Sequence, residues 1–112
     1  MPTLKLFVSD GAIEEARAVR LLENLCDAIS IFETVDPKTI KAGVVTMGPA
    51  LNNSPVKKGF LCLEACILTG RPPELKARMA DALKGVLDSL VGDDGLSLTV
   101  EIREMDRDFY RS

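Results

Sequence analysis

The sequence predicts an α/β (α+β) fold in which two β-α-β repeats form a four-stranded sheet with two helices on one face. Segments with the two-residue period of a strand alternate with segments that have the spacing of an amphipathic helix. Their order is strand, helix, strand, and this order occurs twice, which indicates pseudo-repeats at about 2–47 and 58–105. A length of 112 residues suits a single domain, which we assign to residues 1–112.

The first repeat begins with a strand over residues 3–9, where apolar side chains alternate with the others and indicate one buried face. Ser9-Asp10-Gly11 is a turn and helix-cap signal, and helical spacing then continues to Ser30. A loop through Asp36-Pro37 leads to a second strand over residues 40–47. We expect the apolar positions of the helix to face the sheet, and these are Ile13, Ala16, Val19, Leu22, Cys26 and Ile29.

The second repeat begins with a longer strand over residues 59–68. A loop rich in Gly, Pro, Asn and Ser separates it from the strand at 40–47, and these two strands can form a hairpin across that loop. Prolines in the segment 69–74 suit the first turn of a second helix. After a Gly-Asp-Asp-Gly stop, alternation over 96–103 predicts the last strand. The helix positions expected to face inward are Leu75, Met79, Leu83, Val86, Leu87 and Leu90.

The composition is that of an ordinary soluble globular protein, with 46% hydrophobic and 28% charged residues. The formal net charge is −3 without a basic run, so we expect neither nucleic acid nor a membrane as a partner. The longest apolar stretch, residues 60–68, is interrupted by Glu64 and is much shorter than the roughly 18 residues that span a bilayer. Because the amino terminus lacks a signal-peptide pattern, the predicted location is the cytoplasm.

Missing and rare residue types narrow the chemistry further. The chain contains no histidine, which excludes Ser-His and Cys-His nucleophiles, histidine bases and most zinc sites. Cys26, Cys62 and Cys66 have no disulfide-framework spacing, and the last two would lie about 13 Å apart along a strand, too far to share a metal ion. We interpret the cysteines as structural thiols and predict neither a metal nor a cofactor.

The dipeptide Met1-Pro2 suggests a catalytic base. An initiator methionine is commonly removed before a small residue, and Pro2 would then carry a free secondary amine. An α-amino group titrates near pH 8, and cationic neighbours or burial lower that value toward the range of a general base. Many proteins begin with Met-Pro by chance, so the dipeptide gains its meaning from its place at the start of the first strand.

These features resemble the tautomerase superfamily, whose members begin with proline, consist of paired β-α-β units and assemble around a central pore. The resemblance is greatest to the 5-carboxymethyl-2-hydroxymuconate isomerase group and is seen in Ser9-Asp10, in Gly70-Arg71 and in the closing segment 96–105. It spans most of the chain but is much weaker from Ser30 to Lys58. The resemblance implies a homotrimer and a proline that moves a proton between carbon atoms of an enol or ketone, while arginines hold a carboxylate.

Two cationic residues follow from this resemblance as candidates for binding the substrate. Arg71 matches the family directly, although it has an ordinary alternative as a solvated residue before a helix, where the helix dipole mildly opposes a cation. At the start of the strand near residue 41 the family implies an arginine, whereas this chain has Lys41. Lysine keeps the charge but loses the planar two-pronged grip on a carboxylate.

Three other residues keep two interpretations each. Glu64 interrupts an apolar strand, and it either lines a pocket or marks a subunit boundary. Phe109 and Tyr110 either close a site or belong to a plain tail.

The predicted function is a cofactor-free keto-enol or allylic isomerase that acts on a small carboxylated enol or ketone, with Pro2 as general base. Within the superfamily the same proline, when protonated, serves hydration, dehalogenation or decarboxylation, so these reactions are alternatives. A rival from another class is a non-catalytic ferredoxin-like binding or assembly module in which Met1 is retained and the site is vestigial.

Overall fold

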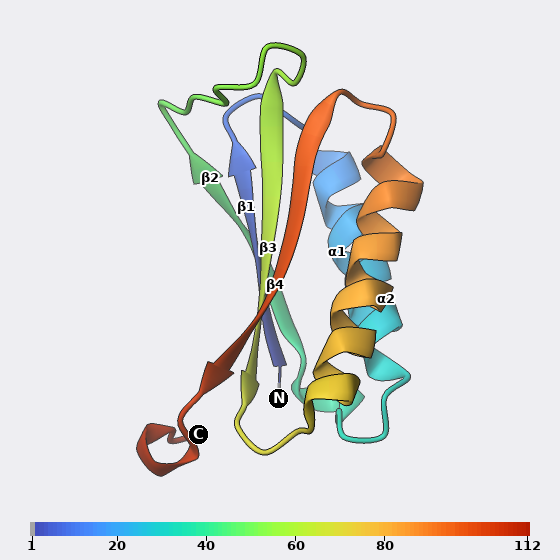
Figure 1. Cartoon of the computed structure of the whole chain (residues 1–112), viewed down its shortest axis with the longest axis vertical. Helices are drawn as coiled ribbons and strands as arrows, with labels where there is room; N and C mark the ends of the chain where they lie inside the picture. Colours follow the sequence, from blue (N-terminus) through green and yellow to red (C-terminus); the bar gives the residue numbers. More distant parts are fainter. Residues whose placement is uncertain (1) are drawn as a thin grey trace.

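The computed structural model describes residues 2–112 and confirms the predicted architecture, a four-stranded sheet with two α-helices against one face (Figure 1). It also contains two short 3-10 helices, one before the second strand and one after the fourth. In chain order the elements are β1 (Pro2–Ser9), α1 (Glu15–Ser30), η1 (Pro37–Thr39), β2 (Lys41–Met47), β3 (Gly59–Leu68), α2 (Pro73–Val91), β4 (Leu96–Met105) and η2 (Arg107–Phe109).

The strands lie in the order β2-β1-β3-β4 across the sheet. β1 and β2 are parallel, β3 and β4 are parallel, and the two central strands β1 and β3 are antiparallel. A helix joins each parallel pair, because parallel neighbours need a long crossover. The predicted hairpin between the strands at 40–47 and 59–68 is therefore wrong, since β1 lies between β2 and β3. The loop between these strands instead passes over the end of β1 (Figure 1).

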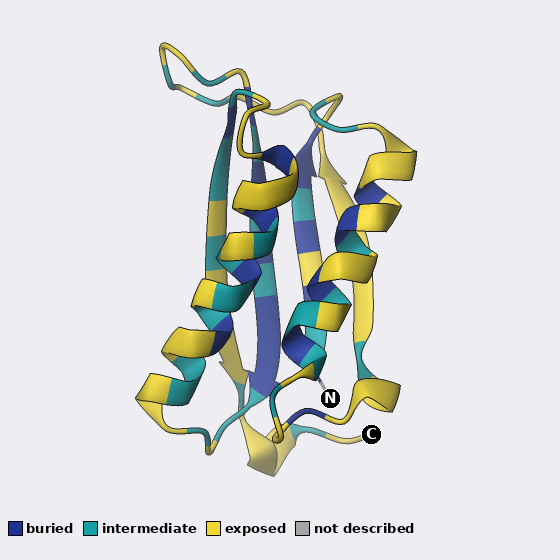
Figure 2. Cartoon of the chain, turned by 90° about the vertical axis from the view of Figure 1, so that its right-hand side faces the viewer, coloured by how far each residue is buried: buried dark blue, intermediate teal, exposed yellow. Residues whose placement is uncertain are grey.

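The hydrophobic core fills the space between the sheet and the helices (Figure 2). Alternate residues of β1 and β3 point into it, as the strand pattern predicts. In α2 the buried stripe ends at Val91, whereas Leu90, which was expected to face inward, is 37% exposed. The core residues of the two central strands are Leu4, Leu6, Val8, Leu61, Leu63, Ala65 and Ile67.

The buried stripe of helix α1 lies beside the one that the sequence predicts, and Ile29 belongs to both stripes. Ala16 and Val19 were expected to face the sheet but are exposed, Val19 to 51%. Leu22 and Cys26 are only half-buried. The helix is apolar over a wide arc, so spacing alone does not decide which of two adjacent stripes the sheet covers. The buried stripe consists of Ala18, Leu21, Leu25 and Ile29.

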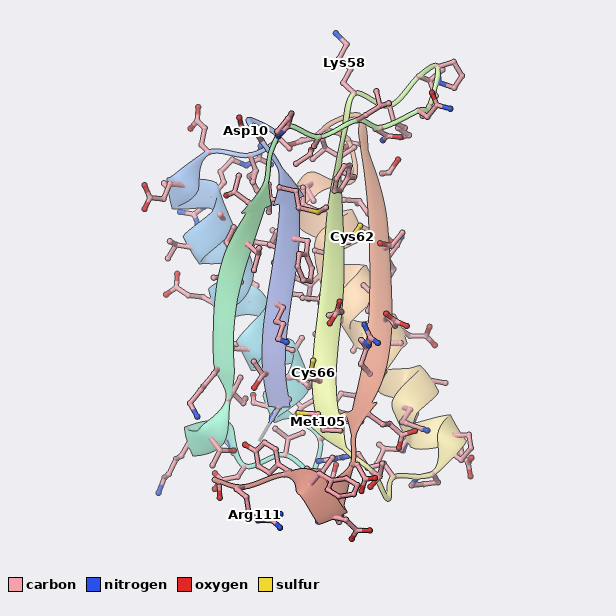
Figure 3. All side chains as sticks on the ribbon, turned by 90° about the vertical axis from the view of Figure 1, so that its left-hand side faces the viewer. Asp10, Lys58, Cys62, Cys66, Met105 and Arg111 are labelled. Carbon is pink, nitrogen blue, oxygen red and sulfur yellow. The ribbon has the colours of Figure 1, made fainter. Side chains whose placement is uncertain are left out.

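No other element of residues 2–112 covers the face of the sheet opposite the helices, which Figure 3 shows with Cys62 and Cys66 on it. Glu64 lies between these cysteines on β3, where its carboxylate is 3.6 Å from the guanidinium of Arg103. Its Cα partner on β1 is Lys5.

Among residues 2–112, no helix combines the length and the apolar character needed to cross a membrane.

Candidate active site

Pro2 is the first residue of β1, one of the two central strands, and it is buried. Its Cα partner is Ile67 on β3, while the next residue, Thr3, is in register with Lys41 on β2. Pro2 therefore lies at the end of the sheet where β1 and β2 begin and β3 and β4 end, marked by the N in Figure 1. Met1 lies outside the described residues, so its removal stays a prediction.

A surface depression of about 530 Å³ lies at this end of the sheet. Small-molecule sites typically have volumes of about 300–1,000 Å³. The lining contains two lysines and no Asp or Glu side chain, which favours an anionic ligand. The lining residues are Lys38, Thr39, Ile40, Lys41, Leu68, Tyr110 and Ser112.

The carboxyl-terminal tail forms one wall of this depression. After β4 it turns through η2 and crosses below the ends of the central strands toward the start of β2 (Figure 3). The Arg107 Nε donates a hydrogen bond of 2.9 Å to the carbonyl of Thr69, which follows β3. Tyr110 is half-buried and lines the depression, whereas Phe109 is 83% exposed. Of the two aromatic residues, Tyr110 alone is therefore placed to contact a ligand there.

Arg71 lies in the turn between β3 and α2, held by three hydrogen bonds. Its Nε donates to the Thr34 hydroxyl at 3.0 Å, and its Nη2 donates to the Thr34 carbonyl at 2.7 Å. Its Nη1 donates to the carbonyl of Leu68 at 3.2 Å. Partial burial, and secondly the nearby guanidinium of Arg107, lower the pKa of Arg71. Arg71 is thus an anchored cation and not a freely solvated one.

The structure places Pro2, Lys41 and Arg71 at one end of the sheet, but in different ways. Lys41 is exposed and lines the depression directly. Arg71 lies behind the wall, because it bonds the backbone of the lining residue Leu68. Glu64 lies three residues before Ile67 on β3, on the open face beside Arg103, and does not line the depression.

A second depression, of about 600 Å³, lies near the opposite end of β1, between α1 and β2. Its lining includes the carboxylates Asp10 and Glu15 and no lysine or arginine. Its volume is similar, but its charge opposes binding of an acid. The depression near Pro2 is therefore the better candidate for a carboxylated ligand.

No protein-family model matches the sequence, and a search of curated proteins finds no match. Solved structures match nearly the whole chain. A 5-carboxymethyl-2-hydroxymuconate isomerase from Deinococcus radiodurans R1 superposes with a TM-score of 0.83 at 27% identity, covering 99% of this chain and 87% of that one. The chain therefore has the fold of these tautomerase-superfamily structures.

Other structures with this fold are more distant in sequence. A protein crystallised after inactivation by 2-oxo-3-pentynoate matches with a TM-score of 0.82 at 15% identity, covering 98% of this chain and 91% of that one. A fused 4-OT that forms a symmetric trimer matches with a TM-score of 0.76 at 21% identity, covering 94% of this chain and 86% of that one. At such identities the likeness concerns the tautomerase fold and not the activity.

Sequence reasoning missed two cations at the Pro2 end of this tautomerase fold, Lys38 and Arg107. Lys38 lies in η1, just before the Lys41 position that the family resemblance singled out. Arg107 comes from a polar tail without periodicity. A tail of this kind gives no pattern from which its path across the sheet could be predicted.

Proposed function

We propose that this chain is a cofactor-free tautomerase that isomerises a small carboxylated enol or ketone, with Pro2 as the base once Met1 is removed. The observation on which this rests is the position of Pro2. It is buried at the start of a central strand, at an end of the sheet where Lys38, Lys41 and Arg71 supply positive charge. The likeness to the Deinococcus isomerase gives independent support.

The proposed reaction is a proton transfer that uses the free secondary amine of Pro2. The neutral nitrogen takes a proton from the enol hydroxyl or from the carbon next to the carbonyl, which leaves an enolate. The protonated amine then returns that proton to a different carbon, so the base is regenerated and the substrate is isomerised. Burial and cationic neighbours both favour the neutral form of an amine, and the same cations stabilise the enolate.

Arg71 and Lys41 have distinct parts in this proposal. Arg71 keeps its guanidinium in a fixed position through Thr34 and Leu68, and the N–H groups not used there are available to a carboxylate. Lys41 is exposed and flexible, so it contributes a point charge without a fixed geometry. In this proposal Arg71 therefore orients the carboxylate of the substrate, and Lys41 neutralises part of its charge.

We also propose that the functional form is a homotrimer. Strand β2 is an edge strand with every residue exposed, including Val44, Val45 and Met47. An exposed apolar edge favours pairing with another chain. The fused 4-OT structure is a symmetric trimer, in line with this proposal. Light scattering is expected to give three times the subunit mass of 12.2 kDa, and a stable monomer at micromolar concentration would rule the trimer out.

The experiment that tests Pro2 uses 2-oxo-3-pentynoate, the reagent that inactivates one of the structural neighbours. A free amine attacks the alkyne carbon that is β to the ketone, and the amine proton moves to the adjacent carbon, so the adduct keeps all the atoms of the reagent. Mass spectrometry of the processed protein is expected to place one adduct on Pro2, with loss of enol-acid isomerase activity.

A form with Met1 retained is the matched control, because its proline nitrogen is an amide. Adduct formation on Pro2 must disappear in this form. If the processed protein isomerises no enol acid and its proline stays unmodified, the non-catalytic binding module replaces the enzyme.

A further inference from the structure

Two arginines from different parts of the chain lie at the turn between β3 and α2. Arg71 belongs to this turn, whereas Arg107 comes from η2 at the end of the chain. The Arg107 Nη2 lies 3.7 Å from the position that a Cβ on Gly70 would occupy, and its Nε donates to the Thr69 carbonyl at 2.9 Å. Gly70 has a φ of +119° and no side chain, so the arginine can lie against the backbone of the turn.

Neither arginine is neutralised within residues 2–112. The ion pairs of this part of the chain join Arg17 to Asp94, Lys76 to Glu104, Lys84 to Asp88 and Arg103 to Glu64. Asp106 is adjacent to Arg107 in sequence, but its carboxylate accepts the backbone N–H of Asp108 at 2.9 Å. Backbone carbonyls alone anchor Arg107 and, with the Thr34 hydroxyl, Arg71.

This arrangement places like charges together at an energetic cost. Partial burial lowers the pKa of Arg71, and the charge of Arg107 lowers it further. Neutral donors would satisfy the same carbonyls without repulsion. A bound anion would reverse the sign of the interaction, because each guanidinium then faces an opposite charge.

The unused donors suit a planar anion with two oxygens. Both Nη groups of Arg107 donate to no other residue described here, and Arg71 has N–H groups beyond its three hydrogen bonds. Carboxylates accept such N–H groups in pairs. Because Arg71 bonds the backbone of Leu68, an anion at this place lies next to the depression near Pro2.

We propose that Arg107 is a further ligand-binding residue, which with Arg71 forms a two-arginine site for one carboxylate group of the substrate. The assignment of the bound molecule as substrate rests on the function proposed above, whereas binding of the carboxylate does not require catalysis. The carboxyl-terminal tail is then part of the site and not only its wall.

The test is a titration of ¹⁵N-labelled protein with pyruvate, a small 2-oxo acid, at constant ionic strength, followed through the arginine Nε–H signals. The signals of Arg71 and Arg107 are expected to shift together, and Arg107→Gln should weaken binding about 5- to 20-fold, the range for loss of a partly exposed charged hydrogen bond. Acetone, which lacks the carboxylate, should shift neither signal. Arg78→Gln is the matched control, since it removes an exposed arginine from α2.

Arg107→Lys separates binding from anchoring of the tail, because lysine can still donate to the Thr69 carbonyl. It should keep the fluorescence of Tyr110, the only tyrosine in a chain without tryptophan, and bind pyruvate more weakly than the wild type. Equal pyruvate affinity in wild type, Arg107→Gln and Arg78→Gln would overturn the two-arginine site. The pyruvate titration does not depend on the proline. If Pro2 failed to react with 2-oxo-3-pentynoate while pyruvate still bound at the two arginines, only the proposed function would be overturned.

Discussion

The two ends of the sheet are built alike but carry opposite chemistry. At each end one central strand begins, the other ends, and a glycine with positive φ follows, Gly11 at one end and Gly70 at the other. The end with Pro2 has a depression of about 530 Å³ lined by two lysines. The opposite end has two depressions, one of about 600 Å³ with Asp10 and Glu15 in its lining and one of about 240 Å³ that contains Asp10 and Asp94 beside Lys58.

The residues after the two glycines show how this difference arises. Arg71 follows Gly70 and directs its guanidinium to carbonyls of the backbone, whereas Ala12 follows Gly11 and packs against the core. At the end of the sheet near Gly11, the Ser9 hydroxyl accepts a hydrogen bond of 2.9 Å from the Phe60 N–H. The Gly11 turn is therefore packed against the core, whereas the Gly70 turn carries a cation that is anchored without an acidic partner. The same backbone unit serves stability at one end and, in our proposal, chemistry at the other.

The largest expected difference between the two ends concerns the amine of Pro2. Retaining Met1 should lower the enol-acid isomerase rate by about 100-fold or more, because a positioned general base is lost. Pro2→Ala keeps a primary amine and should retain part of the activity. Steady-state kinetics on the three proteins, with intact mass measured beforehand, test this. A Met1-retained protein as fast as the processed one would exclude the proline base.

This distinction between the ends was only partly available from the sequence. Strand alternation predicted β1 and β4 correctly, because a strand with one covered face has a period of two. Helical spacing predicted the burial of Ile29 but not the rest of the buried stripe of α1, and the loop composition wrongly allowed a hairpin, because helix rotation and strand order depend on long-range packing. Pro2 was singled out by the Met1-Pro2 dipeptide and Arg71 by a family resemblance, and their roles stay predictions. Arg107 was missed because tertiary contacts alone bring it to the turn.

Arg71 is expected to show the next largest effect. Arg71→Ala should weaken transition-state binding of a carboxylated substrate by about 1.5–3 kcal/mol, the range for loss of a charged hydrogen bond. The measurement is kcat/KM, compared with that for a substrate analogue without the carboxylate. Arg71 also joins the turn to the Thr34 loop, so thermal unfolding must accompany the kinetics. An equal fall in kcat/KM for both substrates would mean that Arg71 has only a structural role.

At the opposite end we expect an effect on stability without an effect on the reaction. A Cβ on Gly59 would lie 2.8 Å from the Ser9 Oγ and 3.2 Å from the Leu96 Cδ2, so Gly59→Ala should lower the free energy of unfolding by about 1–3 kcal/mol. Gly85→Ala is the matched control, because Gly85 lies inside α2 with no atom near its Cβ position. It should raise stability by about 0.5–1 kcal/mol.

Urea denaturation of both glycine variants measures these changes, and kcat/KM of the folded protein should stay at the wild-type value. If Gly59→Ala reduced kcat/KM while the protein remained folded, the division between a packed end and a reactive end would be wrong.

The smallest effect tests whether charge at the packed end is merely structural. Arg17 Nη1 lies 2.6 Å from the Asp94 carboxylate, and its Nη2 donates to the Leu90 carbonyl at 3.0 Å, so this cation is already neutralised. The pair is solvent-exposed, and such pairs contribute about 0.2–1 kcal/mol. Arg17→Gln should therefore lower the free energy of unfolding by no more than about 1 kcal/mol, and less at high salt, where screening weakens the pair. A double-mutant cycle with Asp94→Asn isolates the pair from the Leu90 contact.

Arg17→Gln removes the same charge as Arg107→Gln, so the two-arginine site requires that only Arg107→Gln weakens pyruvate binding. An equal loss of pyruvate affinity in both variants would mean that overall charge, and not the cations gathered near Pro2, attracts the acid.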